Sequence, residues 1–131
     1  MLRIILFSAL LILMPGCSHK APPEDVDKAA GLFFQRLKDA DYDTIYKDAS
    51  TQFKTNKTRE VVVESLKELT AKGRLQDFKR TNTSYRDEGK DQIAMPVYNT
   101  TFEQARGDVT LSFIDEDGEW KLIAFAFKQR S

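Results

Sequence analysis

The chain contains one cysteine and one histidine, and these two reactive side chains, Cys17 and His19, lie close together near its start. A zinc site of the usual type needs several cysteine and histidine ligands in one place, and a disulfide needs a second cysteine. Neither is predicted, and we expect no metal and no cofactor. In an oxidising compartment a lone thiol needs another use, and covalent modification of Cys17 is one.

Tyrosines and carboxylates are the remaining candidates for acid and base chemistry. Tyr98 lies in a predicted strand, and Tyr42 and Tyr46 lie in a predicted helix, so each is a pocket candidate. Because His19 precedes the domain, the folded part lacks the usual acid or base for neutral pH. The acidic run at residues 115–117 does not have the spacing of a calcium loop, and we expect a solvated turn there.

The net charge of the chain bears on whether its partner is a nucleic acid. Lysine and arginine together number 20, and so do aspartate and glutamate, which makes the formal net charge zero. Nucleic acids attract proteins through a basic excess that this chain lacks. We therefore expect no nucleic-acid partner.

An apolar run occupies residues 4–14 and follows Arg3. A helix needs about 20 apolar residues to cross a bilayer, so this run is too short for a stable span. A positive residue followed by a short apolar run is typical of a secretory leader. The run ends at Pro15, Gly16 and Cys17, which places the lone cysteine at the end of the leader.

A small residue directly before a cysteine, after such a run, resembles the lipobox of bacterial lipoproteins. The resemblance implies cleavage between Gly16 and Cys17, a diacylglyceryl group on the Cys17 thiol and an acyl chain such as palmitate on the new amino terminus. Each buried methylene contributes about 0.8 kcal/mol, so several chains would hold the protein on a cell-envelope membrane. Ser18 in place of aspartate implies the outer membrane, facing the periplasm, in a Gram-negative host. An ordinary secretory leader is the alternative.

Length and composition divide the chain into three parts. Residues 1–16 are the expected signal peptide, and residues 17–25 are the lipidated cysteine with a short tether. The tether contains Pro22 and Pro23 among polar residues, which favours an extended spacer. Residues 26–131 are long enough for one domain with its own core.

Three helices are expected in the first half of the domain. The first begins near residue 24, because apolar residues then recur at three- and four-residue spacing up to Leu37. The second covers residues 42–49 after Asp41, its expected cap. The third runs from Thr58 to Gly73, where glycine ends it in the left-handed region. We expect no regular element at residues 50–57.

Four antiparallel strands follow, because the period of the apolar residues changes from helical to alternating. They are expected at residues 75–86, 92–103, 109–113 and 120–127. Pro96 disfavours a regular central strand, so we expect an edge or a bulge there. The last strand is apolar at successive positions, with Leu122, Ala124 and Ala126 on one face and Phe125 on the other. This pattern predicts a strand that is covered on both faces.

Helices followed by strands indicate an α+β domain with three N-terminal helices on a curved antiparallel sheet of about four strands. The order resembles the nuclear transport factor 2-like superfamily, as do the Asp-Ala-Asp-Tyr-Asp step at residues 39–43 and the Asp-Gly-Glu-Trp-Lys-Leu ending at residues 117–122. The likeness extends to small secreted bacterial families of unknown function. It implies a cone with an internal pocket, and it implies no activity, since fold does not fix function.

Three functions are compatible with these observations. The first is a lipid-anchored, non-enzymatic binding or accessory module, favoured by Cys17 and by the absence of a catalytic motif. The second is an enzyme that acts on a small apolar molecule in the cone, with a carboxylate or Tyr98 as acid or base. The third is a structural subunit that dimerises or docks an envelope partner through its sheet, as the apolar last strand suggests.

Overall fold

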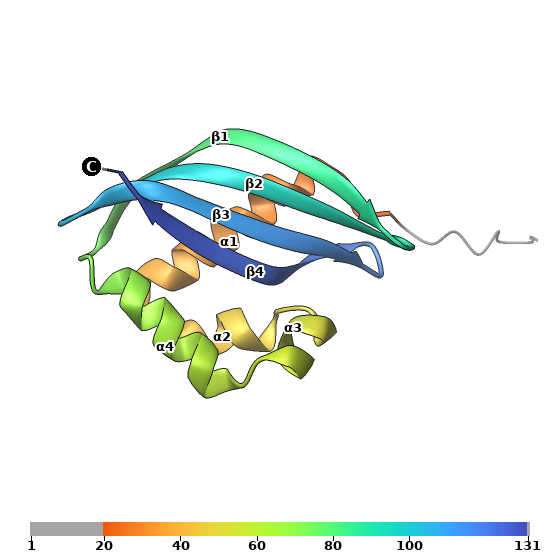
Figure 1. The fold of residues 1–131 in the computed structure, drawn as a ribbon, viewed down its shortest axis with the longest axis horizontal. Helices are drawn as coiled ribbons and strands as arrows, with labels where there is room; N and C mark the ends of the chain where they lie inside the picture. The colour runs from red at the N-terminus through yellow and green to blue at the C-terminus, as the bar shows by residue number, and fades with distance from the viewer. Residues whose placement is uncertain (1–19, 131) are drawn as a thin grey trace, which may run out of the picture.

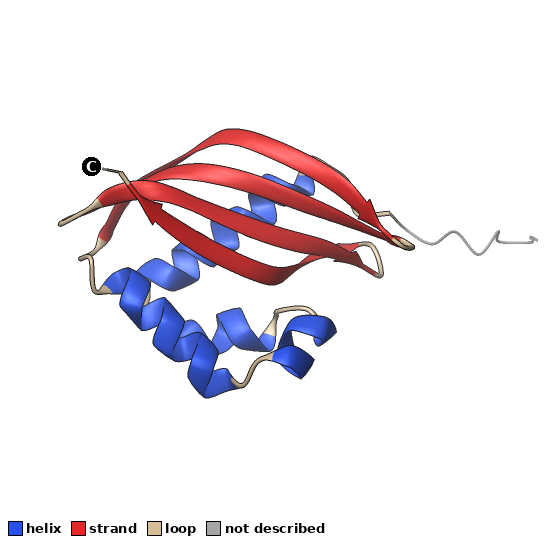
Figure 2. Ribbon diagram, in the orientation of Figure 1, coloured by secondary structure: helices blue, strands red, loops and turns tan. Residues whose placement is uncertain are grey.

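A computed structural model describes residues 20–130, which form four helices followed by four strands (Figures 1 and 2). The α+β class is confirmed, and the helices lie together on one side of an antiparallel sheet in the order β1-β2-β3-β4. The elements are α1 (Asp25–Lys38), α2 (Tyr42–Lys47), α3 (Thr51–Asn56), α4 (Arg59–Thr70), β1 (Leu75–Glu88), β2 (Asp91–Phe102), β3 (Arg106–Glu116) and β4 (Glu119–Gln129).

The expected helix boundaries follow from local capping. The Asp41 side chain accepts a hydrogen bond from the Thr44 amide at the start of α2, and Thr58 accepts from the Val61 amide at the start of α4. Gly73 follows α4 with a φ of 99°, as expected for a left-handed glycine after a helix. A β-carbon at this position would lie 2.7 Å from that of Glu103, so the close approach to the strand also requires glycine.

The expected number of helices is wrong, because α3 lies within the polar stretch that was expected to be irregular. Its start depends on Ser50, whose hydroxyl accepts from the Phe53 amide at 3.0 Å and whose own amide donates to the Leu122 carbonyl at 2.9 Å. Phe53 is its one buried residue. A helix of this length shows no periodicity in the sequence, and its anchor on β4 is a tertiary contact.

An edge strand or a bulge was expected at Pro96. The edge strand is wrong, because β2 lies between β1 and β3, but an irregularity does lie beside Pro96. The β2–β3 ladder skips Met95 and Pro96 and resumes in the same register at Val97. On the other side, β1 carries an extra residue, Thr81, whose hydroxyl donates to the Val97 carbonyl at 3.3 Å. Pro96 has no N–H to donate, and the ladders on both sides of β2 are interrupted next to it.

Within the described chain, the last strand is covered on one face only, and a bulge explains why both faces look apolar in the sequence. Ser112 pairs with Ala124 and Phe113 pairs with Leu122, so Ile123 is an extra residue in β4. Beyond this bulge the faces exchange, because side chains alternate along a strand. The large apolar residues Trp120, Leu122, Phe125 and Phe127 therefore share the face toward the helices, and Ala124 and Ala126 are exposed on the other.

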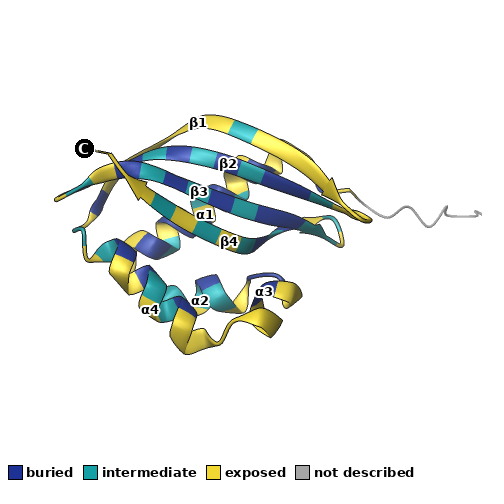
Figure 3. Cartoon of the chain, in the orientation of Figure 1, coloured by how far each residue is buried: buried dark blue, intermediate teal, exposed yellow. Residues whose placement is uncertain are grey.

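One hydrophobic core lies between the sheet and the helices (Figure 3). Its most enclosed members are Phe34 and Leu37 of α1, Leu66 of α4 and Leu111 of β3, each almost without exposed surface. The long helix α1 crosses beneath the gently curved sheet (Figure 1). Among the described residues, no helix is long and apolar enough to cross a membrane.

Candidate functional site

Tyr98 is buried where β2 crosses α1. Its hydroxyl donates to Asp27 Oδ1 at 2.7 Å, and its ring meets Phe34 edge-on with the ring centres 5.1 Å apart. Arg80 of β1 approaches the same carboxylate, with Nε 3.5 Å from Oδ1. The structure thus places Tyr98 in a cluster with one carboxylate and one guanidinium, both about half exposed.

The environment of Tyr98 keeps its phenol protonated. Burial raises the pKa of Tyr98 well above its usual value, and so do the hydrogen bond to Asp27 and the charge of that carboxylate. The charge of Arg80 lowers the pKa, and its effect is smaller. A phenol that stays neutral and already donates to an internal carboxylate is a poor base near neutral pH, and its hydroxyl fastens β2 to α1.

The other two tyrosines link helices. The Tyr42 hydroxyl lies 2.8 Å from Thr70 Oγ1, which joins α2 to α4. The Tyr46 hydroxyl donates to the Lys57 carbonyl at 2.9 Å and to the Lys54 carbonyl at 3.3 Å. The structure does not bring Tyr42, Tyr46 and Tyr98 together, and none of them lines the three cavities that follow.

The space between α1 and the sheet is filled by aromatic side chains. Phe34 and Phe102 are almost fully enclosed, and Phe33 packs edge-on against Phe34 with ring centres 5.4 Å apart. Phe34 also stacks on Phe78 of β1, with ring centres 4.4 Å apart. The cavities therefore lie around the edge of the core.

The largest of them, which we call the hairpin cavity, has a volume of about 350 Å³ and lies between α1 and the β3–β4 hairpin. Its apolar lining residues are Ala29, Leu32, Phe33, Ile45, Phe113, Trp120 and Leu122. Its charged lining residues are Asp25, Lys28, Arg36, Asp48, Glu119 and Lys121. Four of these residues form two ion pairs within the lining, with Arg36 2.9 Å from Asp48 and Lys121 3.0 Å from Glu119. An apolar lining with a charged rim suits a molecule that has both characters.

The start of the described chain docks on the same hairpin. The Ala21 amide donates to Asp115 Oδ2 at 2.8 Å, and Ala21 itself is buried. The Trp120 indole donates to the Pro22 carbonyl at 2.8 Å. Residues 21–25, expected to be spacer, thus contact the sheet and lead directly into α1. Cys17, Gly16 and His19 lie outside the described residues.

The acidic turn is occupied by internal hydrogen bonds. Asp115 accepts from the amides of Ala21 and Gly118, and Glu116 accepts from the amide and hydroxyl of Thr51. Within residues 20–130 no group of carboxylate, cysteine or histidine side chains is placed to hold a metal ion. The turn holds the N-terminal segment and α3 against the sheet, a role that sequence analysis missed.

Trp120 is the other residue that sequence analysis did not assign to a site. It lines the hairpin cavity and at the same time holds Pro22, which lies far from it in the sequence. The only local signal is a single tryptophan directly after an acidic glycine turn. The contact itself depends on how α1 crosses the sheet.

No protein-family model and no curated protein matches the sequence of this chain, so its resemblance to lipoproteins and to the nuclear transport factor 2-like superfamily stays a prediction.

Proposed function

We propose that this protein is a lipid-anchored binding module of a bacterial cell envelope, attached through Cys17, that holds the apolar part of an amphiphilic molecule in the hairpin cavity without converting it. The observation that carries the proposal is the position of that cavity. Trp120 lines it and also fixes Pro22, so the cavity adjoins the segment that leads to Cys17.

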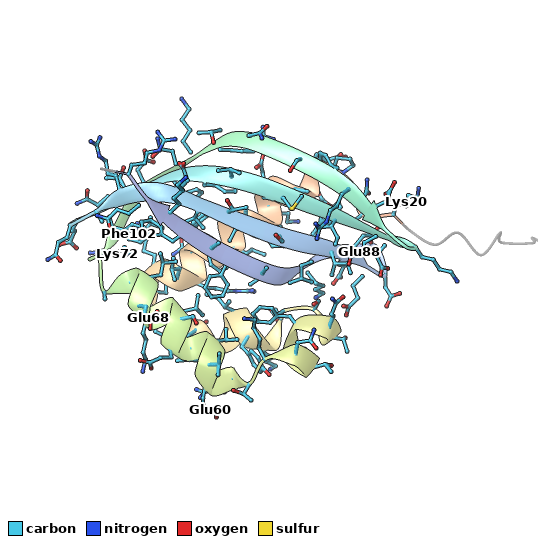
Figure 4. All side chains as sticks on the ribbon, in the orientation of Figure 1. Lys20, Glu60, Glu68, Lys72, Glu88 and Phe102 are labelled. Carbon is cyan, nitrogen blue, oxygen red and sulfur yellow. The ribbon has the colours of Figure 1, made fainter. Side chains whose placement is uncertain are left out.

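The anchor and the cavity are close along the chain. Three residues separate Cys17 from Ala21, so at about 3.5 Å per residue the docked segment begins within about 14 Å of the lipidated residue. The N-terminal segment leaves the domain at the end that carries the β1–β2 turn, where Lys20 and Glu88 lie (Figure 4). That end would face the membrane, and an amphiphile from the membrane surface would reach the cavity over a short distance.

Binding is favoured over catalysis by the chemistry around the core. Tyr98 is held neutral and donates to Asp27, and the phenylalanines fill the space beside it. The only histidine precedes Ala21. The arrangement of α1 beneath a gently curved sheet supports a nuclear transport factor 2-like cone as the fold, with its interior occupied by Phe34 and its neighbours.

The chain carries its own reporter for this proposal, because Trp120 is its single tryptophan. We expect laurate, titrated below its micelle concentration, to shift the Trp120 emission of a soluble fragment 18–131, which contains the whole hydrophobic core. Leu32→Arg places a charge on the cavity lining at a half-exposed position and should weaken binding about tenfold.

The matched control is Val61→Arg, which changes a similarly exposed apolar residue on α4, outside the hairpin cavity. It should bind laurate as the unchanged fragment does. An emission spectrum that laurate does not alter, or equal affinities for the two arginine variants, would exclude the hairpin cavity as the binding site.

A further inference from the structure

We propose that the groove between α4 and the free edge of β4 binds one extended peptide segment of a partner protein, which pairs antiparallel with β4. Two adjoining cavities form this groove, which we call the edge groove, and they have Ser65 of α4 and Phe125 of β4 in common. Their volumes are about 110 Å³ and about 300 Å³. The remaining lining residues are Phe53, Lys57, Val61, Val62, Glu68, Leu69, Lys72, Ala124, Ala126 and Phe127.

The backbone of β4 offers unpaired hydrogen-bonding groups to this groove. The Arg130 amide donates to the Arg106 carbonyl, so every second residue of β4 counted back from Arg130 as far as the bulge at Ile123 forms its backbone hydrogen bonds with β3. Antiparallel hydrogen bonds alternate along a strand, so the N–H and C=O groups of Phe125, Phe127 and Gln129 point away from β3 toward the free edge. Among residues 20–130, the edge is closed only at Leu122, whose carbonyl accepts from the Ser50 amide.

This part of β4 lacks the usual protection of an edge strand. The other edge of the sheet, β1, is interrupted at Gln76 and Thr81 and is largely polar. Residues 124–127 of β4 are four consecutive apolar residues without an interruption in their ladder. An exposed apolar edge is a template for another strand, and proteins normally cover or charge it.

Because α4 lies beside β4, the edge groove favours a single extended strand as its occupant. The helix runs beside β4 and lines both cavities, so an incoming segment lies between a strand and a helix (Figure 1). An extended peptide fits such a groove, whereas a second copy that paired β4 with β4 would bring its own sheet against α4. In peptide recognition of this kind, backbone hydrogen bonds provide affinity and pockets for alternate side chains provide specificity.

The geometry also specifies the chemistry of the peptide. A peptide residue directly opposite Phe125 or Phe127 would exchange backbone hydrogen bonds with it, so its amide would point at β4. Its side chain would lie on the same face as the phenylalanine and therefore point into the groove. Apolar side chains suit these positions. Lys57 lines one of the two cavities and Lys72 the other, and neither has an ion pair within the described chain. Carboxylates at both ends of the peptide would complement them.

Figure 4 shows Glu68 on α4 and Lys72 just beyond its last residue, with Lys72 near Phe102 at the end of the molecule opposite Lys20. The Lys72 ammonium lies over the Phe127 ring, 4.9 Å from its centre, which fixes a positive charge beside the free edge. The Lys72 end of the edge groove therefore lies away from the N-terminal segment and stays open to a partner when the chain is anchored.

The probe is a fluorescent, end-capped peptide of sequence Glu-Thr-Val-Thr-Val-Thr-Glu, in which the glutamates and valines share one face of a strand. We expect it to bind the full chain in phosphatidylcholine nanodiscs, measured by anisotropy against empty nanodiscs. Methylation of both valine amides removes the donors to β4 and should weaken binding about tenfold or more. Methylation of two threonine amides, which point to solvent, should leave binding within about threefold.

Variants of the chain test the same groove. Ser65→Trp fills the position that both cavities share and should abolish binding, whereas Glu64→Trp, on the exposed side of the same helix, should not. The proposal is overturned if the peptide does not bind at about 1 mM or if both methylated peptides bind equally. A concentration-dependent dimer that Ser65→Trp disrupts would also overturn it, because a second copy would then be the occupant.

Discussion

Tyr98 shows how one polar side chain is used to hold two elements together. Its ring is part of the core, and its hydroxyl reaches Asp27 on α1 at 2.7 Å. Asp27 is about half exposed and also receives Arg80, so the carboxylate remains partly in water while it accepts from a buried donor. The same burial and the same neighbour that raise the pKa of Tyr98 make its neutral form part of the native state.

This linkage predicts a dependence of stability on pH. The unfolded phenol has a pKa of about 10, and the folded one is higher, so the native state holds this proton more tightly. The contribution is complete below about pH 10 and is lost as the pH rises above that value. We expect the free energy of unfolding to fall more steeply between about pH 10 and about pH 12 in the unchanged protein than in Tyr98→Phe.

Urea unfolding at each pH measures this difference. At neutral pH Tyr98→Phe should cost about 0.5–1.5 kcal/mol, the usual range for one hydrogen bond. Tyr46→Phe, which removes a hydroxyl bonded to the Lys54 and Lys57 carbonyls away from Tyr98, is the control and should keep the slope of the unchanged protein. Equal slopes in the unchanged protein and Tyr98→Phe would show that Tyr98 does not link folding to pH.

At the scale of elements, the bulge in β4 decides which face of the sheet is apolar. A strict alternation from Trp120 would place Ala124 and Ala126 in the core and turn Phe125 outward. The extra residue, Ile123, exchanges the faces, so both phenylalanines point toward the helices. The outer face of β4 then consists of small and charged residues, and the reason for expecting a covering layer on that face is removed.

Substitutions on β4 distinguish the observed register, in which Ile123 is a bulge, from a strict alternation that begins at Trp120. Ala126→Lys should change the free energy of unfolding by no more than about 0.5 kcal/mol, because the side chain enters solvent. Leu122→Ala, on the buried face, should cost about 2–5 kcal/mol. Thermal or urea unfolding of residues 18–131 measures both, and a large loss for Ala126→Lys would contradict the register described above.

At the scale of the whole molecule, the docked N-terminal segment orients the domain. Ala21 and Pro22 are held by Asp115 and Trp120, so the described chain begins at the end of the sheet that carries the β3–β4 turn. If Cys17 carries lipid, the short link leaves the domain little freedom to rotate away from the membrane. The hairpin cavity then adjoins the membrane, and the Lys72 end of the edge groove lies away from it.

The anchor itself is tested by Cys17→Ser. We expect this change to move the protein from the membrane fraction to the soluble fraction, because the acyl chains supply the membrane affinity. Mass spectrometry of the unchanged protein should show the added lipid. A Cys17→Ser protein that stays in the membrane fraction, together with an unchanged protein of unmodified mass, would refute the lipoprotein proposal.

Much of the fold could be predicted from the sequence because it depends on neighbours along the chain. The apolar stripe up to Leu37 predicts α1, the caps at Asp41 and Thr58 predict where α2 and α4 begin, and Gly73 predicts where the helical region ends. The acidic glycine turns at Gly89 and Gly118 separate β1 from β2 and β3 from β4 as expected, whereas Gly107, expected to help the turn between β2 and β3, lies within β3. The same is true of Tyr98, which could be named as a candidate because its position in an alternating strand allows its side chain to point inward.

What the sequence by itself determined is therefore the class of the fold, the order of helices before strands and the lone cysteine after an apolar run, all of which are local properties. Only the tertiary structure decided that Ile123 is a bulge, that Ser50 starts α3 against Leu122, and that Pro22 rests on Trp120. Each of these depends on a hydrogen bond or register between residues far apart in the chain, where local pattern carries no information. The hairpin cavity and the edge groove arise in the same way, since their walls come from helices and strands that meet only after folding.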